Sequence, residues 1–489
     1  METLLSEFRE SDLAMRQRYV GKLVSACTGR FCLRLVWVWS CVVVLVIPGA
    51  AQELPGELQD KGVEWLQDYI QIDTVNPPGN EIAGAEFFAR ILQAEGIPYE
   101  IVESSPGRGN IWARLKGGNQ PGLLFLHHMD VVPADPEYWL VDPLSGVIKD
   151  GFIYGRGALD TKSSGIVQLA AFLWLHRSGV PLNRDVIFMA TADEEAGGAW
   201  GVGWLVKQRP ELFERIGYAI NEGGGGTSVD GQVRFSVEIT QKIPYWLRLT
   251  TRGQPGHGSR PQVDSAVTRL VSALDRLRAH VFPIRVVPAV DVYFSALSAT
   301  AGSRWQRRYA DIETALREPH VAAELRRDNP SHYGLITNTC SMTRLGGSDK
   351  INVIPTEAWA ELDCRLLPDQ DPEQFLEDLG RVLGDEVQVM VLMGFTPAQS
   401  SAETGLFRAI EAVTQDYFPQ ASVIPSVLTA FTDSHFLRDL GITAYGYDPF
   451  VVPRMDQAGV HGNNERLSVE NVRRGVVVMS DLVARWVVD

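Results

Sequence analysis

The stretch Leu123-Leu-Phe-Leu-His-His-Met-Asp-Val-Val-Pro133 joins a run of bulky apolar residues to polar ones. The run predicts a buried strand of a parallel sheet, and open α/β sheets bind ligands beyond the carboxyl ends of such strands. Because residues i and i+2 of a strand point the same way, we expect His128 and Asp130 to act together, with one imidazole nitrogen on a metal and the other held by the carboxylate. His127 faces the opposite side, where a structural role is expected. Ile111–Leu115 is expected to pair with this strand.

Two later apolar segments end in acidic residues in the same way. Asp185-Val-Ile-Phe-Met-Ala190 leads to Asp193-Glu194-Glu195, and Tyr218-Ala-Ile-Asn221 leads to Glu222 and a run of glycines. A solvated turn would also explain Asp193–Glu195 if that segment stood alone. Three acids at the mouth of a buried strand are costly without a positive charge. Because three strands deliver such residues to one edge, the pattern favours a cation site.

A glycine-rich segment lies between the first two of these strands. Gly151-Phe-Ile-Tyr-Gly-Arg-Gly-Ala-Leu-Asp160 leads into an apolar helical run from Ile166 to Leu175. The spacing of its glycines and lysine does not fit a phosphate-binding loop. Taken alone, Asp160 suits a helix N-cap, a role that aspartate often fills.

The sequence pattern changes near residue 240, where a second domain is expected. Tyr245–Thr251 alternates like an antiparallel strand, Ser265–Ala279 predicts a helix, and Glu357–Arg365 predicts a further strand. The predicted bounds are 52–240 and 396–489 for the catalytic domain and 241–395 for the inserted domain, with an extra insertion near 284–333.

The first 51 residues are typical of a secretory signal peptide. Residues 15–34 carry five basic side chains and no acid, and the 13-residue apolar core Leu35–Ile47 is followed by Pro-Gly-Ala-Ala51. These features predict cleavage after Ala51 and an exported, periplasmic or extracellular protein. An uncleaved membrane anchor is the alternative, although a membrane span needs about 20 residues. Met15 is a second candidate start, because residues 1–14 carry acids that signal peptides normally lack.

The mature chain is acidic. Removal of residues 1–51 takes six of the 45 basic and four of the 60 acidic residues, which leaves 39 and 56, a net charge of −17. This charge argues against nucleic acid and anionic membrane as partners, so membrane contact is expected only through an uncleaved anchor. Only Cys340 and Cys364 remain of the cysteines, too few for a disulfide framework or a thiolate metal site. They either pair in an oxidising compartment or stay as buried thiols.

Taken in order, seven motifs resemble one known family. They are His128-Met-Asp-Val-Val-Pro133, Gly155-Arg-Gly-Ala-Leu-Asp-Thr-Lys162, Asp193-Glu-Glu195, Glu222, His257-Gly-Ser259, Asn352-Val-Ile-Pro355 and His461-Gly-Asn-Asn-Glu-Arg466. The set is similar to the co-catalytic zinc exopeptidases and deacylases that include aminoacylase-1, acetylornithine deacetylase, succinyl-diaminopimelate desuccinylase and glutamate carboxypeptidase. This resemblance implies an α/β, phosphorylase/hydrolase-like zinc exopeptidase domain with a mostly parallel central sheet. It also implies an inserted α+β, ferredoxin-like lid or dimerisation domain.

The resemblance implies two Zn²⁺ ions per subunit, with Co²⁺ or Mn²⁺ as substitutes. Asp160 would bridge the two ions. The remaining ligands would be His128 and Glu222 for one ion, and Glu195 and His461 for the other.

Glu194 is implied as the general base, which takes a proton from a water between the metals and passes it to the leaving amine. Asp130 would orient His128. The Asp160–Thr161 bond matches a position that is cis in the family. One departure is His127, which stands where the family has glycine or another small residue.

The inserted domain resembles the family's dimerisation lid, so a homodimer is implied. His257 is implied as the donor that stabilises the tetrahedral oxyanion in the partner subunit's site. Asn352 and Arg365 match lid positions that grip the substrate's carboxylate. The alternative for Arg365 is a structural ion pair with Asp363, which strand alternation places on the same face. The extra insertion resembles the carboxypeptidase-S branch and its secreted N-acyl-amino-acid relatives.

These inferences support three functions in decreasing order. The first is an exported metallopeptidase, carboxypeptidase- or dipeptidase-like, that cuts the last peptide or amide bond before a free carboxylate. The second is an N-acyl-amino-acid amidohydrolase of the aminoacylase or deacetylase kind with the same machinery. The third, an inactive binding protein on this fold, fits least well because every expected ligand and the base are present. The expected partner is a small peptide or an N-acyl amino acid.

Overall fold

The computed structural model describes residues 56–229, 232–299 and 301–488. The chain divides into two compact units, residues 1–53 and 54–489, so the predicted signal peptide and its cleavage site lie outside the described residues. Across the described part of the chain, no helix combines the length and the apolar character that a membrane crossing requires.

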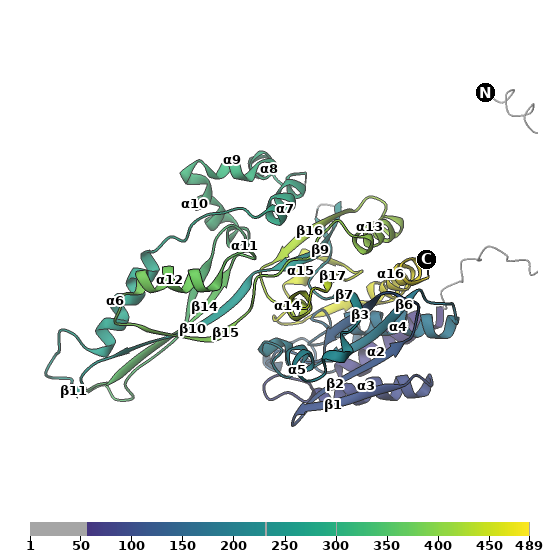
Figure 1. The fold of residues 1–489 in the computed structure, drawn as a ribbon, viewed down its shortest axis with the longest axis horizontal. Coiled ribbons are helices and arrows are strands. Elements are labelled where there is room, and N and C mark those ends of the chain that lie inside the picture. The colour runs from purple at the N-terminus through teal and green to yellow at the C-terminus, as the bar shows by residue number, and fades with distance from the viewer. Residues whose placement is uncertain (1–55, 230–231, 300, 489) are drawn as a thin grey trace, which may run out of the picture. The chain divides into compact units, whose positions relative to one another are not determined.

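The second unit contains a ten-stranded sheet, in the order β1-β2-β6-β3-β7-β17-β9-β8-β18, with β16 also paired to β9 (Figure 1). The four central strands, β6, β3, β7 and β17, run parallel to one another, which confirms the predicted α/β class. The strands are β1 (Tyr99–Ser105), β2 (Arg108–Leu115), β3 (Gln120–His128), β6 (Arg184–Thr191), β7 (Ile216–Asn221), β8 (Gly225–Val229), β9 (Gln232–Gln241), β16 (Ser422–Leu428), β17 (Thr443–Gly446) and β18 (Val451–Pro453).

One predicted strand pairing is wrong. The segment Ile111–Leu115 belongs to β2, and β2 pairs with β1 and β6 instead of β3. The strand β6 lies between them. Local sequence patterns identify strands, but the order of strands in a sheet depends on crossover connections that such patterns do not record.

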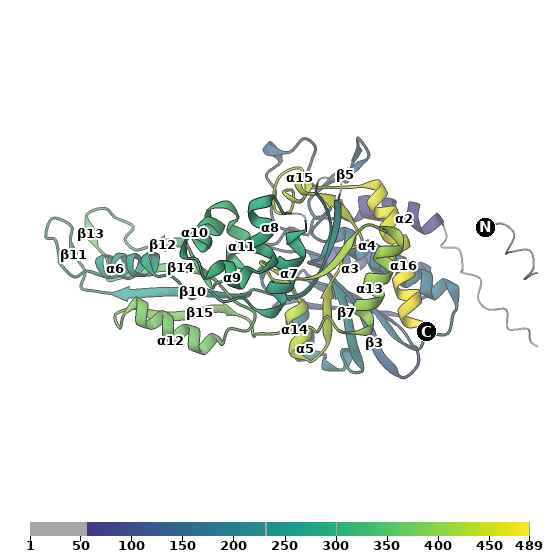
Figure 2. The ribbon, with the colours of Figure 1, turned by 90° about the horizontal axis from the view of Figure 1, so that it is seen from above.

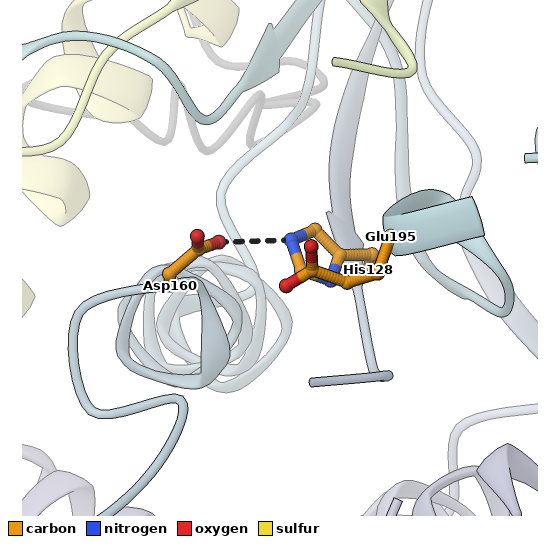
Figure 3. A group of neighbouring side chains, drawn as sticks. All are labelled: His128, Asp160 and Glu195. Atoms are coloured by element: carbon orange, nitrogen blue, oxygen red, sulfur yellow. Dashed lines mark hydrogen bonds and ion pairs between the residues drawn. The ribbon is translucent and has the colours of Figure 1, made fainter. Parts of the chain in front are cut away.

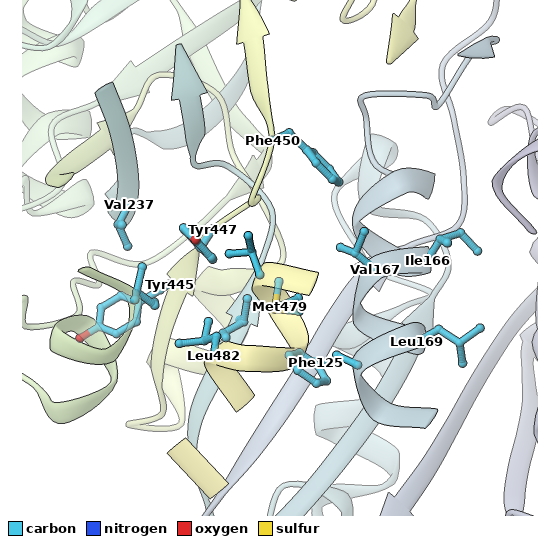
Figure 4. Close-up of a cluster of buried hydrophobic side chains, with 14 of the residues drawn as sticks. Phe125, Ile166, Val167, Leu169, Val237, Tyr445, Tyr447, Phe450, Met479 and Leu482 are labelled. Atoms are coloured by element: carbon cyan, nitrogen blue, oxygen red, sulfur yellow. The ribbon is translucent and has the colours of Figure 1, made fainter. Parts of the chain in front are cut away.

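Strand β3 is buried on both faces, as its apolar run predicts. Leu123 and Phe125 pack into one hydrophobic cluster and Leu124 and Leu126 into another, because successive side chains point to opposite faces. On the first face, Phe125 lies near residues of α4 and α16 (Figure 4). The helices that pack there are α2 (Gly56–Ile70), α3 (Glu81–Ala94), α4 (Lys162–Ser178), α13 (Gly405–Tyr417) and α16 (Val469–Val487); α5 (Val202–Gln208) and α14 (Ser434–Asp439) contribute to the second cluster.

A second, antiparallel sheet follows directly after β9 in the chain. Its order is β12-β14-β10-β15, and its strands and helices enclose a separate hydrophobic core. Inward and outward residues alternate along β14, as the sequence predicts. The elements are β10 (Ile243–Arg252), β12 (Thr339–Gly346), β14 (Glu357–Leu366), β15 (Gln388–Gly394), α6 (Ala266–Ala279) and α12 (Pro372–Leu383), with a small pair β11 (Gly256–His257) and β13 (Val353–Ile354).

Five short helices are inserted between α6 and β12 (Figure 2). They are α7 (Pro288–Ser298), α8 (Ser303–Ala310), α9 (Ile312–Leu316), α10 (Pro319–Asp328) and α11 (Pro330–Gly334). Helix α7 packs on β16 of the large sheet. The neighbouring strands β12 and β14 are joined by a disulfide between Cys340 and Cys364, so the first of the two alternatives for these cysteines holds.

A three-stranded sheet completes the fold near the C-terminus. It has the order β19-β5-β4, and it brings the segment before α4 next to the segment before α16. Its elements are β4 (Ile148–Lys149), β5 (Phe152–Tyr154), β19 (Arg466–Ser468) and, just before β19, the short helix α15 (Arg454–Gln457).

Candidate metal centre

Three strands of the parallel sheet deliver polar residues to one edge. His128 is the last residue of β3, Glu194 and Glu195 begin a 3₁₀ turn two residues after β6, and Glu222 follows β7. Two residues from other segments join them, Asp160 from the turn before α4 and His461 from the loop after α15. Figure 3 shows His128, Asp160 and Glu195 facing one another. The structure thus brings together all five residues that the family resemblance implies as metal ligands.

The first half of the centre forms around His128. Its Nδ1 lies 2.9 Å from the backbone oxygen of Asp130 and donates to it, which places the lone pair of the ring on Nε2. That nitrogen lies 3.1 Å from Oδ1 of Asp160 and 3.4 Å from Oε2 of Glu222. An imidazole lone pair and two carboxylate oxygens are all acceptors, so a cation between them is the natural partner.

The second half forms around His461. Its Nε2 lies 3.1 Å from Oδ2 of Asp160 and 3.2 Å from Oε2 of Glu195. Asp160 therefore turns one oxygen towards each histidine, which is the arrangement that a bridging carboxylate requires. The bond between Asp160 and Thr161 is cis, as the resemblance implies.

The charge of this cluster also fits divalent cations. Three carboxylates face two imidazoles, and burial raises the pKa of Glu222 to about 7. Hydrogen bonds to Asp160 and Glu195 raise the pKa of His461 to about 10. Nitrogen and oxygen ligands without thiolate suit zinc and related metals. When bound, two such ions would supply Lewis-acid activation of a carbonyl group and of a water molecule.

Glu194 lies beside this cluster and is almost fully buried. Its Oε2 is 3.9 Å from Nε2 of His128, and its Oε1 has no hydrogen-bond partner among the described residues. Burial, and then the nearby charge of Glu222, raise the pKa of Glu194 well above its ordinary value. A carboxylate with a free oxygen and a raised pKa is suited to accept and release a proton.

Asp130 has more contacts than the sequence suggested. Its backbone oxygen, not its carboxylate, is the closer partner of His128, since the carboxylate oxygen lies 3.5 Å away. The carboxylate accepts the backbone N–H groups of Glu194 and Glu195, at 3.1 Å each, and the side-chain amide of Asn76 at 2.7 Å. Asp130 therefore supports the histidine of one strand and the glutamates of the next.

His257 and Asn352 are not brought to this centre within one chain. They lie at the end of β10 opposite to the large sheet, where β11 pairs with β13 and the N–H of Gly258 donates to the oxygen of Asn352. Both side chains are exposed, and neither lines the cavity described next.

Arg365 does reach the centre's cavity, and it also forms the predicted ion pair. Its Nε and Nη2 donate to the two carboxylate oxygens of Asp363, at 2.7 and 3.2 Å. Its Nη1 is buried without a hydrogen-bond partner among the described residues. The guanidinium also lies over the ring of Phe431, 5.3 Å from its centroid.

A cavity of about 1030 Å³ contains the centre and extends to the helical insertion. Its polar lining includes four of the predicted ligands, the candidate base and Arg365: Asp160, Glu194, Glu195, Glu222, Arg365 and His461. Its apolar lining comes largely from α7, α8 and the strand ends of the large sheet: Tyr293, Leu297, Trp305, Tyr309, Leu428, Phe431, Phe450 and Val452.

Sequence reasoning assigned no role to three acids near the centre. Asp448 lines the cavity, and burial raises its pKa to about 8. Asp433 lies next to Thr191 at the end of β6, and Glu465 binds the turn that carries Asp160. The signal for Asp448 was present, since it follows the apolar strand β17 as Glu222 follows β7. His127, predicted to be structural, is buried among aromatic rings, and burial lowers its pKa to about 3.

A mostly parallel sheet that gathers imidazoles and carboxylates at one edge, with a proton acceptor beside them, defines a metal-dependent hydrolase. The chain belongs to Peptidase family M20/M25/M40, whose sequence signature matches residues 124–485. The family resemblance seen in the motifs is thereby confirmed.

Relatives with known names cover most of the chain. It is 28% identical over 450 residues to the N-fatty-acyl-amino acid synthase/hydrolase PM20D1 of Mus musculus, with 86% of each chain covered. It is also 28% identical over 442 residues to aminoacylase-1 of Homo sapiens, with 87% of this chain and 95% of the relative covered.

Solved structures share the fold. The M20 family metallo-carboxypeptidase Sso-CP2 from Sulfolobus solfataricus has a TM-score of 0.67 at 20% identity, with 87% of this chain and 98% of that chain covered. Human carnosine dipeptidase 1 has a TM-score of 0.60 at 20% identity, covering 87% and 96%.

Proposed function

We propose that this hydrolase cleaves the amide bond between an apolar acyl group and an amino acid with a free carboxylate. The observation that carries the proposal is the shared cavity. Four of the five predicted metal ligands, the open donor of Arg365 and an apolar wall from α7 and α8 line it. A substrate with a carboxylate at one end, an amide in the middle and an apolar group at the other end has a partner for each part.

The size and lining of the cavity favour an acyl amino acid over a dipeptide. About 1030 Å³ is at the upper end of the range for small-molecule sites, and a dipeptide would fill only part of it. The lining residues of α7 and α8, among them Tyr293, Leu297 and Trp305, include no carboxylate that could bind the free amino group of a dipeptide at that wall. The relatives named for fatty-acyl-amino acid hydrolysis and for aminoacylase activity agree with this preference. A carboxypeptidase or dipeptidase remains the second function, supported by the named activities of the structural neighbours.

In the proposed reaction, residues of this chain carry out three tasks. The Nη1 of Arg365 would bind the substrate's carboxylate and so fix the position of the amide. Glu194 would take a proton from the attacking water with its free oxygen and return it to the leaving nitrogen. The apolar wall would exclude other water from the site.

We further propose that the two cations are Zn²⁺, that the chain is exported after cleavage behind Ala51, and that it acts as a homodimer. The nitrogen and oxygen donor set supports zinc. The basic and apolar N-terminal pattern and the disulfide support export. The exposed position of His257, away from the centre of its own chain, supports a role in a partner's site.

The test is a substrate panel with one amino acid held constant. Acetyl, butanoyl, octanoyl and dodecanoyl derivatives are compared with dipeptides that carry the same C-terminal residue. We expect kcat/KM to rise with acyl length by at least tenfold between acetyl and octanoyl, since each buried CH₂ contributes about 0.8 kcal/mol. A dipeptide that exceeds every acyl derivative would contradict the proposal and favour the peptidase function.

A further inference from the structure

Glu465 is fully buried, four residues after His461 in the chain. Its Oε1 accepts hydrogen bonds from the backbone N–H groups of Leu159 and Asp160, at 2.7 and 3.0 Å. Its Oε2 accepts a third from the backbone N–H of Gly157 at 3.1 Å. One carboxylate therefore accepts three backbone N–H groups of the turn that delivers Asp160 to the metal centre.

Arg156 completes the connection in the opposite direction. Its Nη1 lies 2.7 Å from Oε2 of Glu465, and its Nη2 donates to the backbone oxygen of Gly462 at 2.8 Å. Gly462 follows His461 directly. Arg156 is only 2% exposed, so solvent screens this ion pair weakly. The turn before α4 and the loop after α15 are thus bound to each other through two buried side chains.

The position of the His461 imidazole depends on the backbone of its loop more than the positions of the other predicted ligand side chains depend on theirs. Its side chain is 54% exposed, so little packing restrains it. Its φ is 55°, a conformation that residues other than glycine rarely adopt. By contrast, His128 ends a central strand and has its Nδ1 held by a backbone oxygen. Among the described residues, no hydrogen bond joins Glu465 to His128 or to Glu222.

We propose that Glu465 is a positioning residue that holds His461 against Asp160, and that it selectively preserves the cation shared by Asp160, Glu195 and His461. The other cation, between His128 and Glu222, depends on Glu465 only through Asp160. The substitution Glu465→Gln keeps the shape of the side chain but places an amide nitrogen where one oxygen stood. Both carboxylate oxygens of Glu465 accept N–H groups. In either orientation of the glutamine amide, its NH₂ group would therefore face a backbone N–H donor, and Arg156 would lose its counter-charge.

The experiment counts the metal that the full chain retains. Zinc-loaded protein is dialysed against buffers of graded chelator strength, and bound zinc is measured per chain. We expect two zinc ions in the unsubstituted protein. In Glu465→Gln we expect one ion with little loss of affinity, since it depends on Glu465 only through Asp160, and one released at 10- to 100-fold lower chelator strength, the usual cost of losing a residue that supports a ligand. Turnover should recover as free zinc is raised, with KM unchanged.

Asp185→Asn is the matched control. Asp185 also accepts a backbone N–H, that of Gly117 at 2.9 Å, and pairs with Arg114 at 2.8 Å. It lies at the start of β6, whereas the metal centre lies beyond the end of that strand. This variant should lose some thermal stability and keep both zinc ions at their original affinities.

Three results would overturn the proposal: two ions with original affinity in Glu465→Gln, an equal weakening of both ions, or fewer than two ions in the unsubstituted protein. If circular dichroism shows that Glu465→Gln does not fold, Arg156→Lys decides instead. Lysine has a single nitrogen and cannot bind Glu465 and Gly462 as a guanidinium does, so the same selective weakening is expected. Original affinities in Arg156→Lys would then refute the proposal. The measurement counts metal alone, so a failed acyl panel leaves it unaffected.

Discussion

Arg365 donates to Asp363 with two of its three nitrogens, and the third, Nη1, is buried without a partner among the described residues; its side chain lines the cavity that contains the metal centre. The two sequence-based interpretations of this arginine are therefore compatible. An ion pair with its neighbour two positions earlier orients the guanidinium, and the remaining edge is available to a substrate carboxylate.

Arg365→Lys tests this division of roles. Lysine cannot keep the two-pronged contact with Asp363 and still present a donor to the cavity. We expect kcat/KM to fall by the equivalent of about 1–3 kcal/mol, the range of hydrogen bonds to charged groups. Amidation of the substrate's carboxylate should cost the unsubstituted enzyme a similar amount and the variant much less. Arg344→Lys, on an exposed neighbouring strand, is the control. Equal losses on amidation in both enzymes would exclude Arg365 from carboxylate binding.

Glu194→Gln should abolish turnover while the protein keeps its metal. Glutamine cannot accept the proton, and loss of a general base costs about 10²–10⁴ in rate. Asp160→Ala should lose both metal and activity, because one oxygen of Asp160 faces each histidine. Metal content by atomic absorption, beside steady-state kinetics, separates the two variants. If Glu194→Gln loses one metal equivalent, then Glu194 is a ligand and the base lies elsewhere.

His257→Ala should be inactive with its metal in place if this histidine acts in a partner subunit's site. Mixing it with Glu194→Gln should restore up to about a quarter of the activity after subunit exchange, since hybrid dimers then hold one complete site. His320→Ala is a control on an exposed histidine of the helical insertion. Absence of recovery, once hybrids are demonstrated by mass spectrometry, would indicate a monomer or a role within one chain.

His332 should make the fold less stable in mild acid. Burial lowers its pKa to about 4, with Arg234 and Arg454 adding to the shift, and the hydroxyl of Tyr309 donates to its Nδ1 at 2.8 Å. The ordinary histidine pKa is about 6.5, so between pH 6.5 and 4 the unfolded chain binds more protons than the folded one. Stability therefore falls as the pH falls through this window.

The comparison is between the unsubstituted protein and His332→Gln, by chemical unfolding at pH 7 and pH 5. The unsubstituted protein should lose about 1–2 kcal/mol more than the variant over this interval. The control His176→Gln replaces an exposed histidine and should lose as much stability between pH 7 and pH 5 as the unsubstituted protein. Parallel losses in the protein and in His332→Gln would show that other groups determine the acid sensitivity.

Four of the five predicted ligand residues follow a local signal, an apolar strand or a glycine-rich turn that ends in His, Asp or Glu, whereas His461 was identified only through the family resemblance. Such signals depend on neighbours in sequence, and the parallel sheet brings their ends together. The contacts that hold the ligands were not predictable in this way. Asn76 reaches Asp130 and Glu465 reaches Asp160 only after the chain has folded, and no spacing in the sequence marks such pairs. The prediction that β2 pairs with β3, where the structure places β6, failed for the same reason, because strand order depends on contacts between segments that are distant in sequence.

The five helices between α6 and β12 supply part of the cavity's apolar wall, yet none of the predicted metal ligands or the base belongs to them. On the proposed function, this insertion would contribute to selection of the acyl group, whereas every residue assigned to bond cleavage lies elsewhere in the chain. A contiguous cassette of fewer than 50 codons, residues 288–334, can be exchanged with the corresponding cassette of a related enzyme while every residue of the metal centre stays in place.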